Sequence, residues 1–323
     1  MKIDVIATTI SGSISDWKKI EQIKPLFAEH GFNDVTLHSC DTHSEARQIA
    51  CNSLLAGGRR PISAGGSGTF RSVMEGCLDS SVPMDEIRLG FLRKGSADLI
   101  GKVLKMPDNI DDAISVFATS LKNDTYLDAD LLFAKCPHTN DTGKHFIGYG
   151  GVGLFGRIPH FTENRHMKWY KGLLSQFFGD LGPFTTGMIL SLGEQFFRRP
   201  MEWIIEIDGA QFTKTRYHAL ILANGYLGPD MSFSDKPLNS RCFQLFGLRD
   251  IGKAKLMQQA MKARSGKILE NPKKWGFDEF TINEKLILTP DRKDFPVNID
   301  GSTMPAEKSI EFSRVGAVPL LCK

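Results

Sequence analysis

The sequence predicts an α/β amino-terminal half followed by a strongly β carboxy-terminal half, and three observations support this division. Apolar strands alternate with amphipathic helices up to about residue 123. A glycine-rich turn, Gly65 to Thr69, joins one of these strands to a helix. Beyond residue 123, short strands and turn-rich connections dominate. Alternating strands and helices indicate a parallel sheet with helices on both faces, so we expect one domain at 1–123 and a β-sandwich or similar β-rich domain at 124–323.

The elements of the first half follow one another at short intervals. The expected strands are 3–9, 35–39, 62–64 and 87–92, and the expected helices are 16–30, 44–54 with Ser44 as its cap, 69–78, 99–104 and 111–121. Small or hydroxyl-bearing residues follow each strand, namely Ser11 and Gly12, Thr42, Gly65 to Thr69, and Ser96 with Asp98. Ligands of parallel sheets bind at the carboxyl ends of the strands. The four turns therefore favour a binding site at that edge.

The glycine turn suggests what the ligand is. A strand, a glycine turn and a helix start together direct backbone N–H groups toward a phosphate. Glycine suits such a turn because a Cβ would block close approach of the backbone, and the helix N-terminus favours an anion. The alternative is a tight strand-to-helix turn without a ligand. Small or hydroxyl-bearing residues also follow the other three strands, and this agreement favours the phosphate site.

The second half is expected to be mainly strands. They are predicted at 126–134, 145–154, 203–207, 217–223, 242–248, 281–288, 297–299 and 309–312. Asp208-Gly209 predicts a hairpin turn. Two helices interrupt the strands, at roughly 165–198 and 250–264. The first is rich in Phe and Trp, which is typical of a core helix or a lid, with a lipid-facing helix as the alternative.

The bulk composition limits the function. The length of 323 residues suits one large or two ordinary domains, and 41% hydrophobic with 24% charged residues suits a soluble globular protein. A net charge of +3 gives no indication of nucleic-acid binding, although a slightly basic surface suits an anionic membrane or a phosphorylated ligand.

Cysteine usage and the amino terminus bear on the compartment. The six cysteines are scattered without a C-x-x-C pair, so we expect reduced, mostly buried thiols rather than a metal site or disulfides. The chain begins directly with a strand pattern, and no apolar run reaches the roughly 18 residues of a membrane span. We therefore expect a cytoplasmic protein, with peripheral association at the membrane as the alternative.

Five segments, in order along the chain, resemble the diacylglycerol kinase catalytic family, which includes bacterial lipid kinases and the sphingosine and ceramide kinases. Residues 64–73 resemble its G-G-D-G-T motif and the following helix, and 89–98 its L-G-x-x-P-x-G-T-x-N turn. Residues 146–153, 223–229 and 297–301 are similar to its later glycine-bearing strand, N-G…G segment and D-G-E motif. The resemblance covers almost the whole chain.

The resemblance implies a fold and an activity. The fold is a doubly wound, Rossmann-like nucleotide domain followed by a β-sandwich, with the active site in the cleft between them. The activity is transfer of the γ-phosphoryl group of Mg-ATP to a lipid hydroxyl, with ATP and Mg²⁺ as cofactors. The implied partners are a lipid or other hydroxyl-bearing acceptor and, transiently, a membrane surface, but no nucleic acid. A homodimer stays an open alternative.

Residue roles also follow from the resemblance. The nucleotide would be bound by Ser11, Gly12, Thr42, Gly65, Gly66, Ser67, Gly68, Thr69, Arg71, Ser96 and Asp98. Of these, Gly65 to Thr69 would hold the phosphates, with Arg71 at the following contact position. Asp300, with the motif positions Ser67 and Ser302, would form the catalytic set. Asp98, Asp128 and Asp130 would supply metal ligands.

Three positions depart from the family pattern. Ser67 replaces the aspartate of G-G-D-G-T, Ser302 replaces the glutamate of D-G-E, and Ser240 replaces an aspartate in a stretch linked to a structural metal. A serine hydroxyl neither accepts a proton readily nor balances a divalent cation. Phosphoryl transfer depends mainly on positioning and electrostatics, so an active kinase is the first hypothesis. The second is a relative that binds nucleotide or lipid with little turnover.

Other catalytic patterns are missing from the sequence. It contains no H-x-x-x-H or H-x-x-E-H pair, no G-x-S-x-G elbow and no G-x-x-x-x-G-K-[ST] loop. We expect each of the eight histidines to be an ordinary surface residue or a hydrogen-bonded core residue, not a metal ligand.

Overall fold

A computed structural model describes the chain over residues 1–8, 14–93, 101, 103–107, 109–140, 142–163, 190–193, 199–226 and 233–322. The predicted site residues Ser11, Gly12, Ser96 and Asp98 lie outside these residues, as do half of the helix expected at 99–104 and most of the helix expected at 165–198. The described chain divides into two compact units, residues 1–129 with 317–323, and residues 130–316.

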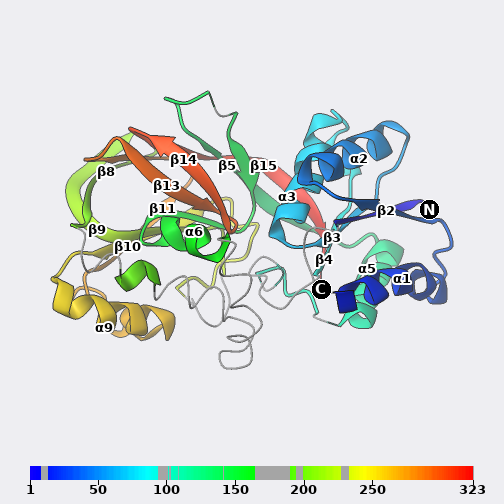
Figure 1. Cartoon of the computed structure of the whole chain (residues 1–323), viewed down its shortest axis with the longest axis horizontal. Coiled ribbons are helices and arrows are strands. Elements are labelled where there is room, and N and C mark those ends of the chain that lie inside the picture. Colours follow the sequence, from blue (N-terminus) through cyan, green and yellow to red (C-terminus); the bar gives the residue numbers. More distant parts are fainter. Residues whose placement is uncertain are drawn as a thin grey trace. The chain divides into compact units, whose positions relative to one another are not determined.

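The first unit contains a parallel sheet with helices on both faces. Its strands are β1 (Ile3–Thr8), β2 (Val35–Cys40), β3 (Pro61–Gly65), β4 (Leu89–Arg93) and the last residues of β15 (Ile310–Leu321). They run in the order β15-β4-β3-β1-β2, and every pair is parallel. Its helices are α1 (Ile14–Glu29), α2 (His43–Leu55), α3 (Ser67–Asp79) and α5 (Ile110–Asn123), with a short turn η1 (Met84–Glu86). In Figure 1, α2 and α3 lie on one face of the sheet, and α1 and α5 on the other.

Burial explains why these segments form this sheet. All six residues of β1 and all five of β3 are buried, as expected for parallel strands covered on both faces. Phe70 of α3 packs on Phe91 of β4 with ring centroids 4.9 Å apart. Phe117 of α5 is also fully buried. The predicted doubly wound α/β half is confirmed.

The second unit is built from antiparallel strands. They are β5 (Leu127–Lys135), β6 (Lys144–Phe146), β7 (Tyr149–Gly153), β8 (Met201–Ile207), β9 (Ala210–Ala223), β10 (Phe243–Arg249), β11 (Phe277–Ile282), β12 (Lys285–Pro290), β13 (Asp294–Ile299), β14 (Ser302–Glu307) and the first part of β15. The helices are η2 (Phe155–Arg157), α6 (Ile158–Glu163), α9 (Lys253–Arg264) and η5 (Lys267–Glu270). β9 pairs with β7, β8 and β10. The strongly β second half is therefore also confirmed.

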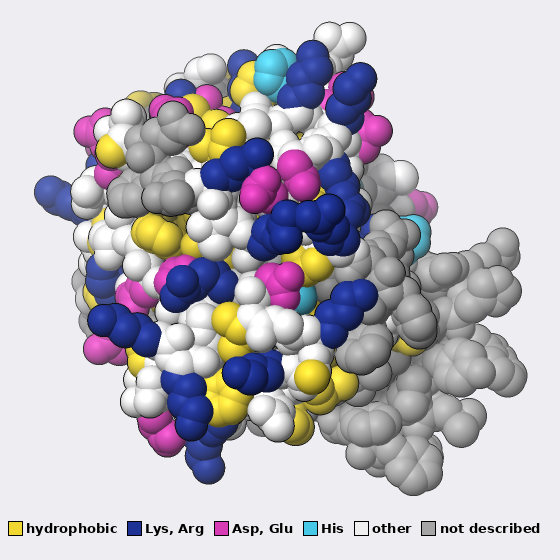
Figure 2. Space-filling view, turned by 90° about the vertical axis from the view of Figure 1, so that its left-hand side faces the viewer, with side chains coloured by type: hydrophobic (Ala, Val, Ile, Leu, Met, Phe, Trp, Pro, Cys, Tyr) yellow, Lys and Arg dark blue, Asp and Glu magenta, His cyan; other side chains and the backbone are white. Residues whose placement is uncertain are grey.

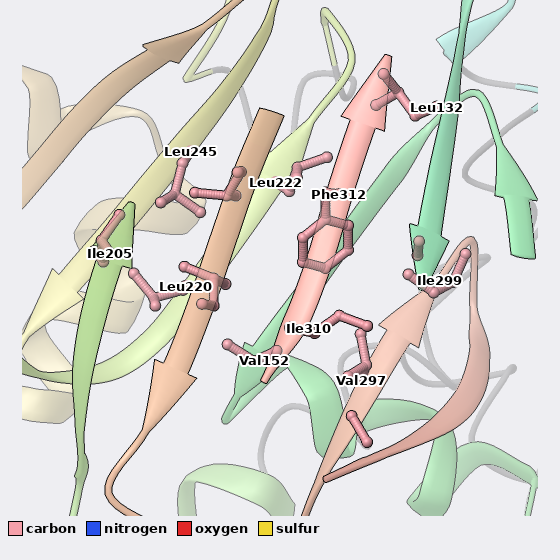
Figure 3. Packing of buried hydrophobic residues seen from close by; sticks show 14 of the residues in the cluster. Leu132, Val152, Ile205, Leu220, Leu222, Leu245, Val297, Ile299, Ile310 and Phe312 are labelled. Carbon is pink, nitrogen blue, oxygen red and sulfur yellow. The ribbon is translucent and has the colours of Figure 1, made fainter. Parts of the chain in front are cut away.

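Alternate residues of these strands form one apolar core. Figure 3 shows Leu220 and Leu222 of β9, Val297 and Ile299 of β13, and Phe312 of β15 within it. In β8 the buried positions alternate with partly exposed ones, which is the period of a strand with one face on a core.

The boundaries of two strands differ from the sequence prediction. Asp208 and Gly209 form the predicted hairpin turn, with φ of 49° and 83°. The Asp208 carboxylate accepts hydrogen bonds from the backbone N–H groups of Asn283, Glu284 and Lys285, at 3.0, 2.9 and 2.8 Å. These bonds stabilise a turn between β11 and β12, so the single strand predicted at 281–288 was wrong.

The cysteines match their prediction. Cys40, Cys77, Cys136 and Cys242 are buried, and all six are free thiols. Among the helices in the described residues, none combines the length and apolar character needed to cross a bilayer.

Candidate functional site

The N-terminus of α3 follows β3 with one intervening residue, Gly66. Gly66 is the N-cap with extended dihedrals (φ −90°, ψ −176°), and no side-chain hydrogen bond from a described residue caps it. The first helical hydrogen bond runs from the Phe70 N–H to the Gly66 carbonyl at 3.1 Å. The N–H groups of Ser67, Gly68 and Thr69 therefore have no acceptor within the helix. The helix begins two residues before its predicted start at Thr69, which places Ser67 and Gly68 in its first turn.

The two glycines before the helix have different surroundings. A Cβ built on Gly65 would lie 2.5 Å from Thr69 Oγ1, whereas one built on Gly66 would meet no described atom within 4 Å. Thr69 is buried, and its Oγ1 lies 2.6 Å from Oγ1 of Thr8. Gly65 is thus required by packing. Gly66 instead leaves open space beside the N–H groups, as an approaching anion requires.

A cationic side chain lies one helical turn beyond this open space. Arg71 is four residues after Ser67, so the two share a face of α3. Nη1 of Arg71 is buried and, among the described residues, has no hydrogen-bond partner. A buried guanidinium N–H without an acceptor is costly. An anion at the start of α3 would provide that acceptor.

His43, the first residue of α2, lies against the same turn. A Cβ built on Gly68 would be 2.8 Å from the His43 ring. Burial and, to a smaller extent, the Arg71 charge lower the pKa of His43. The imidazole is therefore neutral at physiological pH and close to the Arg71 guanidinium.

Thr42 positions the start of α2. Its hydroxyl accepts the Glu45 N–H at 3.1 Å, which makes Thr42 the N-cap instead of the predicted Ser44. The Glu45 carboxylate accepts the Asp41 N–H at 2.9 Å. Such reciprocal bonds stabilise a helix start. Thr42 thereby fixes His43 beside the first turn of α3.

In the second unit, hydrogen bonds connect three polar residues through Ile147. Asp300, in the turn between β13 and β14, accepts the N–H groups of Ile147 and Tyr149 at 3.3 and 2.8 Å. The Asn224 amide donates to the carbonyls of Ile147 and Asp130 at 2.9 and 2.7 Å. Asp130, Asn224 and Asp300 are all nearly fully buried. The structure thus places the predicted residues Asp130 and Asp300 in one buried network.

Asp130 is held mainly by the backbone. Its Oδ2 accepts the Arg241 N–H at 2.6 Å, and Oδ1 lies 3.9 Å from the Arg314 guanidinium. Burial raises the pKa of Asp130 above its usual range. The neighbouring Ser240 donates its hydroxyl to the Cys242 carbonyl at 2.9 Å. Ser302 lies opposite Ile299 at the start of β14.

The described carboxylates do not by themselves form a metal site with three or more protein ligands. Within the described residues, no group of three or more His, Cys, Asp or Glu side chains could hold a metal ion. Asp128 is exposed on β5, while Asp130 and Asp300 direct carboxylate oxygens at backbone N–H groups. These residues therefore give no position for Mg²⁺.

Three residues of these clusters were not among the predicted site residues. His43 follows the predicted Thr42 directly, but a single histidine at a helix start gives no chemical signal. Thr8 ends the first strand, and apart from its hydroxyl group nothing in the sequence indicates that it lies against Thr69. Asn224 lies in the N-G…G segment, where the motif itself could have indicated it.

Comparisons with known proteins identify a matching family model and solved structures of similar fold. Residues 2–127 match the family model of the diacylglycerol kinase catalytic domain. No curated protein sequence matches the chain. The fold is similar to that of a putative diacylglycerol kinase from Bacillus anthracis str. Sterne, with a TM-score of 0.70 and 17% identity, covering 100% of this chain and 95% of the other. A diacylglycerol kinase structure from the same organism gives a TM-score of 0.64 and 16% identity, covering 100% and 97%. The chain thus carries a diacylglycerol kinase catalytic domain match over residues 2–127, in a fold shared with these structures.

Proposed function

We propose that this chain is a kinase that transfers the γ-phosphoryl group of ATP to a lipid hydroxyl, with the nucleotide phosphates bound at the N-terminus of α3. The observation that best supports the proposal is the buried Nη1 of Arg71, which has no hydrogen-bond partner among the described residues, in the second turn of a helix whose start no described side chain caps. Both features lie inside the segment that matches the catalytic domain.

The residues at this helix start fit a phosphate group. The N–H groups of Ser67, Gly68 and Thr69 would donate to phosphate oxygens, and Gly66 would allow the backbone close approach. Arg71 would balance the negative charge and gain the missing acceptor. Bound ATP would supply the phosphoryl group, and the protein would contribute mainly its position and the surrounding charge. Asp300, Ser67 and Ser302 remain the predicted catalytic positions.

Phosphoryl transfer is tested directly with labelled nucleotide. Purified protein, ATP labelled in the γ-phosphate and Mg²⁺ are incubated with diacylglycerols and long-chain bases in mixed micelles. We expect a labelled lipid product. A matched variant, Ser67→Asp with Ser302→Glu, restores two family carboxylates. If only this variant labels a lipid, the natural protein is not a kinase for the acceptors in the panel.

The second candidate is a nucleotide-binding relative with little turnover, and the serines at positions 67, 240 and 302 favour it. Since the phosphates would be held by N–H groups and Arg71, both candidates predict that ATP or ADP raises the melting temperature even in EDTA. A protein that binds nucleotide in EDTA but labels no acceptor supports the second candidate. Indifference of the melting temperature to nucleotides contradicts both.

A further inference from the structure

Helix α9 and the chain that follows it form a basic surface with exposed methionines, which we call the α9 surface (residues 253–275). These residues include seven Lys or Arg and a single acidic residue, Glu270. Met257 and Met261, one turn apart, are 53% and 59% exposed, and Leu269 of η5 is 41% exposed. Met257 and Met261 thus place two long apolar side chains in water within a strongly basic segment, a combination that is typical of helices that lie at a membrane interface.

The methionines lie between lysines on the outer face of α9. At 100° per residue, Met257 lies about 40° from Lys253 and Met261 about 100° from Lys262, whereas Lys255 is exposed nearer the edge of the buried face. The opposite face carries Leu256 and Gln259, both buried. Figure 2, viewed from the side on which α9 lies in Figure 1, shows hydrophobic side chains between Lys and Arg side chains in its lower part.

Contacts of Gln259 on the buried face and of Lys262 at the edge of the helix fix it in place. The Gln259 amide donates to the carbonyls of Arg249 and Trp275 at 3.0 and 2.7 Å. The ammonium groups of Lys262 and Lys274 lie 5.1 and 5.6 Å from the centre of the Trp275 ring. The outer face is therefore presented by a helix that is already folded and anchored.

The lysines at the start of α9 do not stabilise the helix. Lys253 and Lys255 occupy its first turn, which contains no acidic residue. A positive charge at this end opposes the helix dipole and costs stability. Asp250 accepts the N–H of the N-cap Gly252 and offsets part of this cost, and an external anionic partner would gain from the same positive charge.

We propose that the α9 surface docks on an anionic lipid bilayer, with Met257 and Met261 entering the interface and the surrounding lysines contacting lipid phosphates. Basic residues attract anionic headgroups, and apolar side chains on the same face gain from leaving water. Nucleic acid would use the charge, but it offers the two methionines no apolar environment. A lipid bilayer is therefore the partner that accounts for both the positive charge and the exposed methionines.

Vesicle sedimentation tests the proposal with the full chain and without nucleotide, so its outcome is independent of kinase activity. We expect binding to phosphatidylcholine vesicles that contain phosphatidylglycerol, and little to phosphatidylcholine alone. Raising the salt to 0.5 M should weaken it because the lysines are exposed. Lys253→Gln with Lys255→Gln should lower the partition coefficient about 25-fold, at roughly fivefold per lysine. Met257→Ser with Met261→Ser should lower it at least about tenfold.

A charge-matched control separates this surface from net charge. Lys293→Gln with Lys308→Gln removes two exposed lysines elsewhere in the same unit and should change the partition coefficient less than about twofold. Melting temperatures show that each variant is folded. Three results would overturn the proposal: no wild-type binding to anionic vesicles, equal losses in the control and the α9 variants, or retention of an oligonucleotide in place of vesicles.

Discussion

Replacing Gly66 with alanine should weaken nucleotide binding while leaving the free energy of unfolding nearly unchanged. In the described structure a Cβ at Gly66 meets no atom within 4 Å, and the backbone φ of −90° suits any residue. The free energy of unfolding should therefore change by less than about 1 kcal/mol. A bound phosphate would meet the new methyl group and lose close contact with the N–H groups. Each charge-assisted hydrogen bond contributes about 1.5–3 kcal/mol, so we expect nucleotide affinity to fall roughly 30-fold.

Calorimetric titration of ATP into wild type and Gly66→Ala measures this loss, and denaturant unfolding measures stability. Gly65→Ala is the matched control. Its Cβ would lie 2.5 Å from Thr69 Oγ1 and displace the hydroxyl that lies 2.6 Å from Thr8, which should cost about 1–3 kcal/mol of stability. Unchanged ATP affinity in a folded Gly66→Ala protein would refute phosphate binding at this turn.

Three further variants test the two units. Arg71→Gln should weaken ATP binding about tenfold with little loss of stability, because the buried Nη1 is unpartnered among the described residues; equal affinity in calorimetry would contradict this. The pKa of His43 is lowered, so its contribution to stability falls as pH drops through about 6.5. A bound phosphate should favour the protonated ring, so lowering the pH from 7.5 to 5.5 should tighten ATP binding more in wild type than in His43→Gln; equal tightening would argue against it. Asp300→Ala should lower the free energy of unfolding by about 2–4 kcal/mol, since it unpairs the N–H groups of Ile147 and Tyr149; an unchanged denaturant midpoint would disprove this.

The sequence predicted features that short-range chemistry determines. The glycine turn after β3 and the Asp208-Gly209 hairpin follow from residues that are neighbours in the chain. The end of β11 does not follow from neighbouring residues, because the Asp208 carboxylate that stabilises the turn after it is 75 residues away from Asn283 in the chain. The strand predicted at 309–312 extends to Leu321, where Leu320 pairs with Leu89. Such parallel pairing between distant segments leaves no local signal.

Of the candidate site, the backbone could be predicted and its side-chain surroundings could not. The lowered pKa of His43 depends on the packing of α2 against α3, which approach closely because Gly76 lies against the Arg47 backbone. Nothing within either helix alone indicates that contact. Likewise Asn224 links Asp130 to Ile147 only because separate strands bring them together.

A structure with a non-hydrolysable ATP analogue tests the central claim most directly. We predict that the terminal phosphates lie within about 3 Å of the N–H groups of Ser67, Gly68 and Thr69, with Arg71 Nη1 donating to a phosphate oxygen. Phosphates bound elsewhere, with the start of α3 unliganded and Arg71 still without an acceptor, would contradict the account.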